Sequence, residues 1–378
     1  MIIIKEVKTK RDLKKFIEYP IKLYKDNKYY TPPLVGDDIK DFTVSKNPSY
    51  KVCKSKSFLA YKDNKIVGRI CALYNPLADE KFNTKRIRFR HFDAIDDIEV
   101  TKALFKAARD YALELGMEEI EGPNGFTDMD KEGMLIEGFD EKTLFFTYYN
   151  APYYKTHMEQ IGLTKQVDWF EYRITLPETI DPRLEKVSEF CLRRGYKVIK
   201  TKTHKELSPY IQKAFKLYNE AFAPLYGTVP LSEELVDYYM GSFLPLLDLD
   251  FISIIEDKEG EVIGFAAVVP SLGKATTKCK GKLFPFGWYH LLKALKKNDT
   301  IDMLLIAVKP ELQGLTAING LLMLEILKTC IKHGIKYAET GPELEVNTLV
   351  QGQWSNYERV LARKRRLFIA KLEDLKLE

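Results

Sequence analysis

The sequence lacks any apolar run of about 18 residues, the length that a membrane-spanning helix needs. Its short apolar start, Ile2 to Ile4, meets Lys5 and Glu6 at once, whereas a secretion signal has a longer apolar core. These two absences predict a cytoplasmic protein. They leave contact with the inner face of a membrane as the one membrane role still open.

Cysteine and histidine are scarce. The chain has five of each, with no CxxC pair and no histidines at ligand spacing, so neither a disulfide framework nor a metal site is predicted. A dominant charge is also lacking, since 59 basic residues face 54 acidic ones and the net charge is only +5. This mixture argues against nucleic acid as a partner, because nucleic-acid-binding proteins concentrate basic residues in a patch. The densest basic run, 363–366, is either a loop or helix end before a final strand, or a cradle for phosphates or anionic lipid.

The composition is otherwise typical of a packed protein, with 45% hydrophobic and 30% charged residues. A chain of 378 residues is longer than a single hydrophobic core usually supports, so two domains are expected. Aromatic residues reach 12%, which suits either a large core or a cavity for an apolar ligand.

The chain contains two copies of one pattern. A hairpin is predicted at 58–73, with a polar turn at 62–64 and Gly68 early in its second strand. The pattern recurs at 251–269, with Gly264 in the matching place. Glycine at this point permits a β-bulge or the close approach of another backbone.

Each copy continues with a long helix that ends in glycine and leads into a short strand. These helices are predicted at 99–115, before Gly116, and at 317–333, before Gly334. Each half thus has the order β-α-β-β-β-α-β, with an insertion near 272–297 in the second. The fold class is α/β with a mixed sheet. A linker near 175–183 with two prolines divides the chain into an N-terminal domain, 1–178, and a C-terminal domain, 179–378.

The segment 301–320 carries the most recognisable motif, a strand that leads through Gln313 and Gly314 into a helix. It resembles the signature of the GCN5-related N-acetyltransferase (GNAT) superfamily, whose strand runs into Q/R-x-x-G-x-G/A. Free N–H groups at such a helix start bind the pyrophosphate of coenzyme A. The resemblance implies an oxyanion donor among the backbone N–H groups near Ala307 or Val308. It places the coenzyme at Ile306, Ala307, Val308, Gln313, Gly314, Leu315, Thr316, Ala317 and Ile318.

The motif departs from the signature at two positions, where Thr316 and Ile318 replace a glycine and a small residue. The matching segment of the first half, 92–100, has no such loop. Its acidic residues would repel a pyrophosphate, although they are good caps for the following helix. Only the C-terminal domain is therefore a candidate for donor binding.

Taken whole, the chain resembles the tandem-GNAT proteins that include bacterial ceramide synthases. The resemblance rests on the long stretches 121–139, 148–154, 283–287, 339–347 and 363–366. It implies transfer of an acyl group, fatty in the ceramide synthases, from acyl-CoA or acetyl-CoA to a small-molecule or lipid amine, such as a long-chain base, without a metal. An acyl carrier protein in place of coenzyme A stays open as the donor.

Three residues are candidate catalytic residues for such a reaction. Glu339 ends the strand after the signature helix, where its carboxylate would reach the amine directly or through water. Capping a turn or pairing with a lysine is its alternative role. Asn347 is expected to begin the next helix, so a cap is its alternative. Tyr357 is a candidate acid for the leaving thiolate, and a place in the core or on the surface is its alternative.

The glycine-rich segment 124–138 differs from a plain linker because it combines several glycines with acidic residues. Loops of this kind often carry function. We expect its polar groups to hold the cationic amine acceptor, and the candidates are Asn124, Asp128, Asp130 and Glu132.

Two further hypotheses stay open. The lysine-edged aromatic stretch 283–297 either lines an acyl pocket, lies on a membrane surface, or packs on the sheet by its leucine face. The departures at Thr316 and Ile318 also suit a non-catalytic pair of GNAT folds that binds a ligand or a partner protein.

Overall fold

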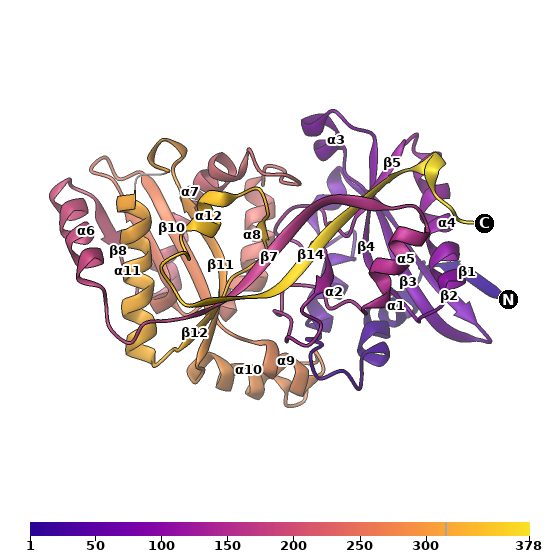
Figure 1. The fold of residues 1–378 in the computed structure, drawn as a ribbon, viewed down its shortest axis with the longest axis horizontal. Helices are drawn as coiled ribbons and strands as arrows, with labels where there is room; N and C mark the ends of the chain where they lie inside the picture. The colour runs from indigo at the N-terminus through magenta and orange to yellow at the C-terminus, as the bar shows by residue number, and fades with distance from the viewer. Residues whose placement is uncertain (314–315) are drawn as a thin grey trace. The chain divides into compact units, whose positions relative to one another are not determined.

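The computed structural model describes residues 1–313 and 316–378, which form two compact units (Figure 1). Unit 1 comprises Met1–Phe170, Gly273–His290 and Ala362–Glu378. Unit 2 comprises Glu171–Leu272 and Leu291–Leu361. The boundary at residue 178 stays a prediction about where the two sequence repeats meet, whereas the units follow packing and take segments from both halves of the chain.

Unit 1 is built on a mixed sheet with the strand order β1-β2-β3-β4-β5-β14. Only β4 and β5 are parallel. Figure 1 shows β14, drawn in yellow, reaching β5 near the C-terminus. The elements that lie in or begin in this unit are β1 (Ile2–Glu6), α1 (Lys10–Leu23), α2 (Val35–Asp41), β2 (Lys54–Lys62), β3 (Lys65–Tyr74), α3 (Pro76–Phe82), β4 (Arg86–Ala94), α4 (Ile98–Glu114), β5 (Glu119–Gly122), β6 (Met134–Glu137), α5 (Tyr153–Gln160), β7 (Thr164–Thr175), α9 (Gly273–Cys279) and α10 (Gly287–Lys296).

Unit 2 repeats this plan with the strand order β8-β9-β10-β11-β12-β7. Here β11 and β12 are the parallel pair. The remaining elements are α6 (Pro182–Arg193), β8 (Lys197–Ile199), α7 (His204–Phe222), α8 (Glu233–Phe243), β9 (Ile252–Glu256), β10 (Val262–Pro270), β11 (Thr300–Val308), α11 (Thr316–His333), β12 (Tyr337–Glu339), β13 (Glu343–Leu344), α12 (Thr348–Gly352) and β14 (Arg359–Lys371), which ends in unit 1.

The two predicted hairpins are confirmed, and each shifts register next to its glycine. A Cβ atom on Gly68 would lie only 2.8 Å from Leu104 of α4. A Cβ atom on Gly264 would lie 2.9 Å from Ile318 of α11. The glycines therefore permit both a bulge and a close approach. The nearest groups are helix side chains, and at Gly68 the backbone oxygen of Asp93 would also lie 3.2 Å from the added Cβ.

The predicted ends of the long helices are also confirmed. Gly116 and Gly334 follow α4 and α11 with φ angles of 72° and 68°, in the left-handed region that favours glycine. At its start α4 is capped by Asp97, whose side chain accepts a hydrogen bond from Glu99 N–H.

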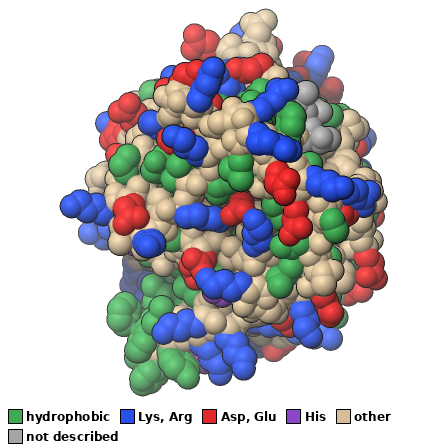
Figure 2. Space-filling view, turned by 90° about the vertical axis from the view of Figure 1, so that its left-hand side faces the viewer, with side chains coloured by type: hydrophobic (Ala, Val, Ile, Leu, Met, Phe, Trp, Pro, Cys, Tyr) green, Lys and Arg blue, Asp and Glu red, His purple; other side chains and the backbone are tan. Residues whose placement is uncertain are grey.

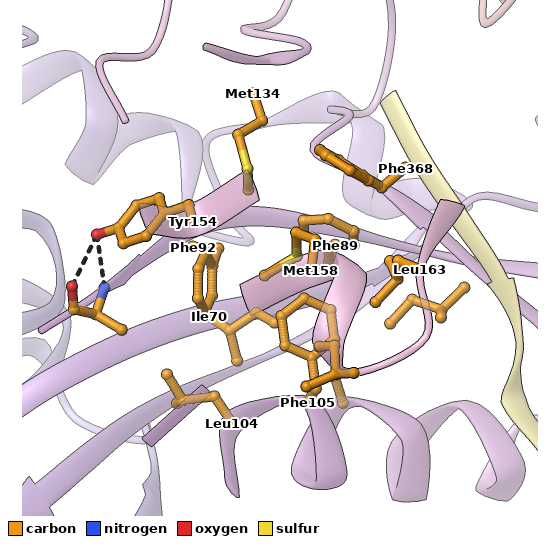
Figure 3. Packing of buried hydrophobic residues seen from close by; sticks show 14 of the residues in the cluster. Ile70, Phe89, Phe92, Leu104, Phe105, Met134, Tyr154, Met158, Leu163 and Phe368 are labelled. Atoms are coloured by element: carbon orange, nitrogen blue, oxygen red, sulfur yellow. Dashed lines mark hydrogen bonds between the residues drawn. The ribbon is translucent and has the colours of Figure 1, made fainter. Parts of the chain in front are cut away.

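The core of unit 1 packs aromatic side chains from β4, α4 and α5 against the sheet (Figure 3). Phe89, Phe92 and Phe105 form tilted or edge-to-face ring pairs with centroids 5.0–5.3 Å apart. Tyr154 anchors α5, because its hydroxyl bonds both the N–H and the C=O of Ala94 (dashed in Figure 3). The core thereby fixes the end of β4.

The basic run 363–366 lies inside β14. Arg363 and Arg365 are 1% and 0% exposed, and their guanidinium groups bond backbone carbonyls of unit 1. Arg366 forms a two-point ion pair with the fully buried Asp168. A cradle for phosphates or anionic lipid is therefore wrong for this run, and so is a loop or helix end. Strand alternation turns two of its arginines into the interior.

Candidate functional site

The parallel strands of unit 2 separate after a short shared stretch. β11 pairs with β12 only from Thr300 to Asp302, although it pairs with β10 as far as Val308. Along 303–308, no strand of the described chain pairs with β11 on its β12 side. A strand edge without a partner presents backbone N–H and C=O groups, which can bind the oxyanion and the amides of a thioester donor.

The predicted coenzyme residues surround the end of this open edge. Ala307 and Val308 are buried and Ile306 is half-buried. Gln313 reaches back, since its Nε2 donates to the Val308 carbonyl at 3.0 Å.

The helix α11 then begins at Thr316, with Ala317 in its first turn. Gly314 and Leu315 lie outside the described residues. Ile318 packs into the core of unit 2 against Gly264, so its side chain is buried rather than exposed at the helix start.

The matching place in unit 1 is occupied. β4 pairs with β5 only from Arg86 to Arg88, but the backbone of Ala94 is bound by the hydroxyls of Tyr154 and Tyr153 at 2.8 and 2.7 Å. The start of α4 carries the charge of Asp97, which is also paired with Lys62 at 2.9 Å. The lack of a pyrophosphate site in the first half stays a prediction.

The three predicted catalytic residues have different surroundings. Glu339 is 6% exposed and accepts a hydrogen bond from Arg173 Nε at 2.6 Å. Asn347 caps α12, since its side chain accepts from Val350 N–H. Tyr357 is half-buried on the core of unit 2, near Trp354. The cap expected for Asn347 is therefore present, and the catalytic roles stay predictions.

Glu343 is the carboxyl group that the sequence reasoning missed. Its Oε1 accepts a hydrogen bond from Trp354 Nε1 at 2.7 Å, while its buried Oε2 has no hydrogen-bond partner in the described chain. Burial raises the pKa of Glu343 to about 7, although the bond from Trp354 and the charge of Arg359 oppose this. A carboxyl group that titrates near neutral pH suits general acid–base catalysis. The available signal was its place in the motif 339–347, just after the strand end.

The acidic loop of unit 1 is folded back on itself. Asp130 accepts hydrogen bonds from the N–H groups of Phe126 and Thr127, so its carboxylate closes the loop. Asn124 is 1% exposed, and neither amide atom of its side chain has a hydrogen-bond partner in the described chain. An unsatisfied buried amide usually indicates a ligand or a water.

The two other predicted acceptor residues interact with each other. Burial, reinforced by Asp128, raises the pKa of Glu132 well above its usual range. Burial therefore disfavours the charged form of Glu132, which argues against this carboxyl group as the main anchor for a cation.

Two classes of feature are absent from residues 1–313 and 316–378. No three His, Cys, Asp or Glu side chains are grouped so as to hold a metal ion. No helix in these ranges has the length and the apolar character needed to cross a membrane.

The duplicated sheet with its separating parallel strands defines a tandem GNAT fold, and solved structures agree. A tandem GNAT protein from the clavulanic acid biosynthesis pathway matches with a TM-score of 0.57 over 98% of this chain and 99% of that chain, at 11% identity. A probable N-acyltransferase from Enterococcus faecalis V583 matches with a TM-score of 0.52 over 99% of this chain and 73% of that one, at 10% identity. The chain is a tandem GNAT-fold protein.

No family model matches the sequence. Protein YghO of Escherichia coli K12 is 30% identical over 347 residues, which cover 90% of this chain and 87% of YghO. The chain belongs to the family of YghO. A bacterial ceramide synthase from Caulobacter vibrioides is 28% identical over 296 residues, which cover 77% of this chain and 75% of that protein. The resemblance inferred from the motifs is thereby confirmed.

Proposed function

We propose that this chain is an N-acyltransferase that moves an acyl group from coenzyme A to an amine. The observation that carries the proposal is the open edge of β11, which ends at Val308, with the start of α11 at Thr316. Such an arrangement offers amide groups to a thioester and a helix N-terminus to a pyrophosphate. The kinship with a bacterial ceramide synthase favours a fatty acyl chain and a long-chain base.

In the proposed reaction the amine nitrogen attacks the thioester carbon. Backbone N–H groups near Ala307 and Val308 stabilise the negative oxygen that forms. A carboxylate takes the proton of the amine, the carbon–sulfur bond breaks, and the thiolate takes a proton from the Tyr357 hydroxyl. No covalent intermediate with the protein is needed.

We assign the base to Glu343 in preference to Glu339. The Glu339 carboxylate already binds Arg173, whereas one oxygen of Glu343 is unbonded in the described chain. A base with a pKa near 7 is also matched to catalysis near neutral pH. Glu343 follows β12, where that strand leaves the edge of β11.

Calorimetric titration with coenzyme A and then with palmitoyl-CoA tests the donor site. A Thr316→Asp variant places a negative charge at the start of α11 and should abolish binding, while Thr316→Ser, the matched control, should bind as the wild type does. Failure of both ligands to bind the wild type would refute the donor site. Binding without thiol release across a panel of amines would instead favour the non-catalytic ligand-binding alternative.

We further propose that the segment 282–289 contacts an anionic lipid surface. Phe284 and Phe286 are 82% and 73% exposed, and neighbouring exposed aromatic side chains of this kind mark an interaction surface. Figure 2 shows hydrophobic side chains gathered low on the face it presents, with basic side chains beside them. Exposed lysines precede the aromatic residues and complement anionic headgroups; they are Lys274, Lys278, Lys280 and Lys282.

Co-sedimentation with vesicles tests this surface. Phe284→Ser combined with Phe286→Ser should lose binding to vesicles that contain phosphatidylglycerol, and the wild type should bind neutral phosphatidylcholine vesicles less. Equal binding by the double variant and the wild type would overturn the proposal. Because these side chains are exposed, their replacement should leave the fold unchanged.

A further inference from the structure

Unit 1 holds a second group of polar side chains, most of which lie outside the acidic loop. Its centre is an ion pair, in which Arg69 Nε and Nη2 lie 2.8 and 2.7 Å from Asp93 Oδ2. The other oxygen of Asp93 accepts a hydrogen bond from the Tyr24 hydroxyl at 3.0 Å. These groups satisfy one another. We call the group around them the polar cluster of unit 1, and its further members are Tyr19 of α1, Tyr30, Asp38 of α2, His91 of β4 and Lys131.

Three atoms of the polar cluster are buried without a hydrogen-bond partner in the described chain. They are the hydroxyls of Tyr19 and Tyr30 and the Oδ2 atom of Asp38. Tyr19 and Tyr30 are only 6% and 7% exposed. Burial raises the pKa of both tyrosines, and the charge of Asp93 raises each further. The Tyr30 ring lies 5.0 Å from the Tyr24 ring, whose hydroxyl bonds Asp93. Buried polar atoms of this kind are normally satisfied, by protein, water or ligand.

The position and the tautomer of His91 leave the Asp38 carboxylate charged, with its Oδ2 atom lacking a hydrogen bond. His91 Nδ1 receives hydrogen bonds from Arg90 Nε at 3.2 Å and from the Tyr148 hydroxyl at 3.1 Å, so the ring proton must lie on Nε2. Nε2 is 3.8 Å from Asp38 Oδ2, too far for a hydrogen bond. Burial alone would raise the pKa of Asp38, but His91 and Lys131 outweigh it and hold the value at about 2.

The charges around the cluster favour a positive ligand. Arg69 is matched by Asp93, and Arg90 is matched by Asp41. The basic groups that act on the cluster are Lys40, Arg69, Arg90 and Lys131, and the acidic groups are Asp37, Asp38, Asp41, Asp93 and Asp130. Acidic groups therefore outnumber basic ones even when Lys131 is counted. Aromatic faces, which also attract cations, are close by, since the Tyr24 and Tyr30 rings lie 5.0 Å apart.

We propose that the polar cluster of unit 1 binds the primary ammonium group of a small organic cation. An ammonium carries three N–H donors, and the cluster offers three unsatisfied acceptors, on Asp38, Tyr19 and Tyr30. The ammonium charge complements Asp38. This site lies within unit 1 and does not depend on acyl transfer in unit 2, so it stands or falls separately from the proposed function.

Calorimetry on the full chain with n-butylammonium chloride tests the proposal. Tetramethylammonium chloride is the matched control ligand, because it has the same charge and no N–H donors, and sodium butyrate controls for the alkyl chain. Saturable binding of n-butylammonium alone is expected. Equal heats from the two cations would overturn the proposal. So would a crystal soaked with n-butylammonium in which only water meets Tyr19, Tyr30 and Asp38.

Two tyrosine variants separate binding from folding. Tyr30→Phe removes an unpartnered hydroxyl, so it should weaken n-butylammonium binding about 3- to 10-fold without lowering the melting temperature of the free protein. Tyr24→Phe, at the neighbouring ring, removes a hydroxyl that bonds Asp93 and Tyr154, so it should lower the melting temperature. Unchanged affinity in Tyr30→Phe would contradict the assignment.

Asp38→Asn keeps the size of the side chain and removes its charge. It should weaken binding at least tenfold, because the charge-assisted bond to the ammonium is lost. Wild-type affinity in a folded Asp38→Asn protein would overturn the proposal. If that variant fails to fold, the Tyr30→Phe result decides.

Discussion

Replacing Glu343 by glutamine should make unit 2 more stable above neutral pH. Burial raises the pKa of Glu343 from 4.5 to about 7, a shift that corresponds to about 3 kcal/mol. Between these two pH values the folded state holds a proton that the unfolded state has lost. Stability therefore falls as the pH rises through this window, and the full cost is reached above pH 7.

The glutamine variant avoids this cost because it never ionises. Its amide oxygen can still accept the hydrogen bond that Trp354 Nε1 donates to Glu343 at 2.7 Å, so little packing is lost. The variant should be more stable than the wild type by up to about 3 kcal/mol at pH 8, and by much less at pH 5. Urea unfolding followed by tryptophan fluorescence at both pH values measures the difference.

The exposed Glu358 supplies the control, since a solvated carboxylate has little to gain from the same replacement. Parallel pH dependence in the wild type and in Glu343→Gln would refute the reasoning. If Glu343 is also the base, the variant should lose about 10²- to 10⁴-fold in activity, together with the rise in rate around pH 7. A gain in stability with normal activity would support the raised pKa of the buried Glu343 carboxyl group, and it would refute the proposal that Glu343 is the catalytic base.

Two further predictions concern the fold. Gly264→Ala should destabilise unit 2 by about 1–3 kcal/mol in urea unfolding, because the added Cβ would lie 2.9 Å from Ile318; Gly352→Ala, with nothing within 4 Å, should not. Asp168→Asn should destabilise unit 1 by about 3–5 kcal/mol, since it leaves Arg366 without its buried partner. Although burial opposes it, Arg366 lowers the pKa of Asp168, so this contribution should be present above about pH 4 and be lost as the pH falls further; a wild-type protein as stable at pH 2 as at pH 6 would contradict it.

The duplication could be read from the sequence because its signals are local. Gly68 and Gly264 mark bulges within single hairpins, and Gly116 and Gly334 end single helices. Each of these features depends on residues within a few positions along the chain. The motif around Gln313 is local as well, and it predicted the strand and the helix that flank the proposed donor site.

The site chemistry depends on contacts between distant residues. Glu343 was visible in the motif, but its pKa near 7 follows from burial beside Trp354, eleven positions later. The polar cluster brings Tyr19, Asp38 and Asp93 together from α1, α2 and β4, which nothing in their spacing indicates. Burial, and therefore electrostatics, is a property of the packed unit.

The sequence by itself determined the repeated strand and helix order, because turns, caps and periodicity act over short distances. Only the tertiary structure decided that β14, at the end of the chain, completes the sheet of unit 1 beside β5. Earlier along the same strand, β14 pairs with β6, and there Arg363 and Arg365 are buried anchors instead of an expected surface run. A strand can pair with any compatible edge, and which edge it meets is set by non-local packing rather than by its own residues.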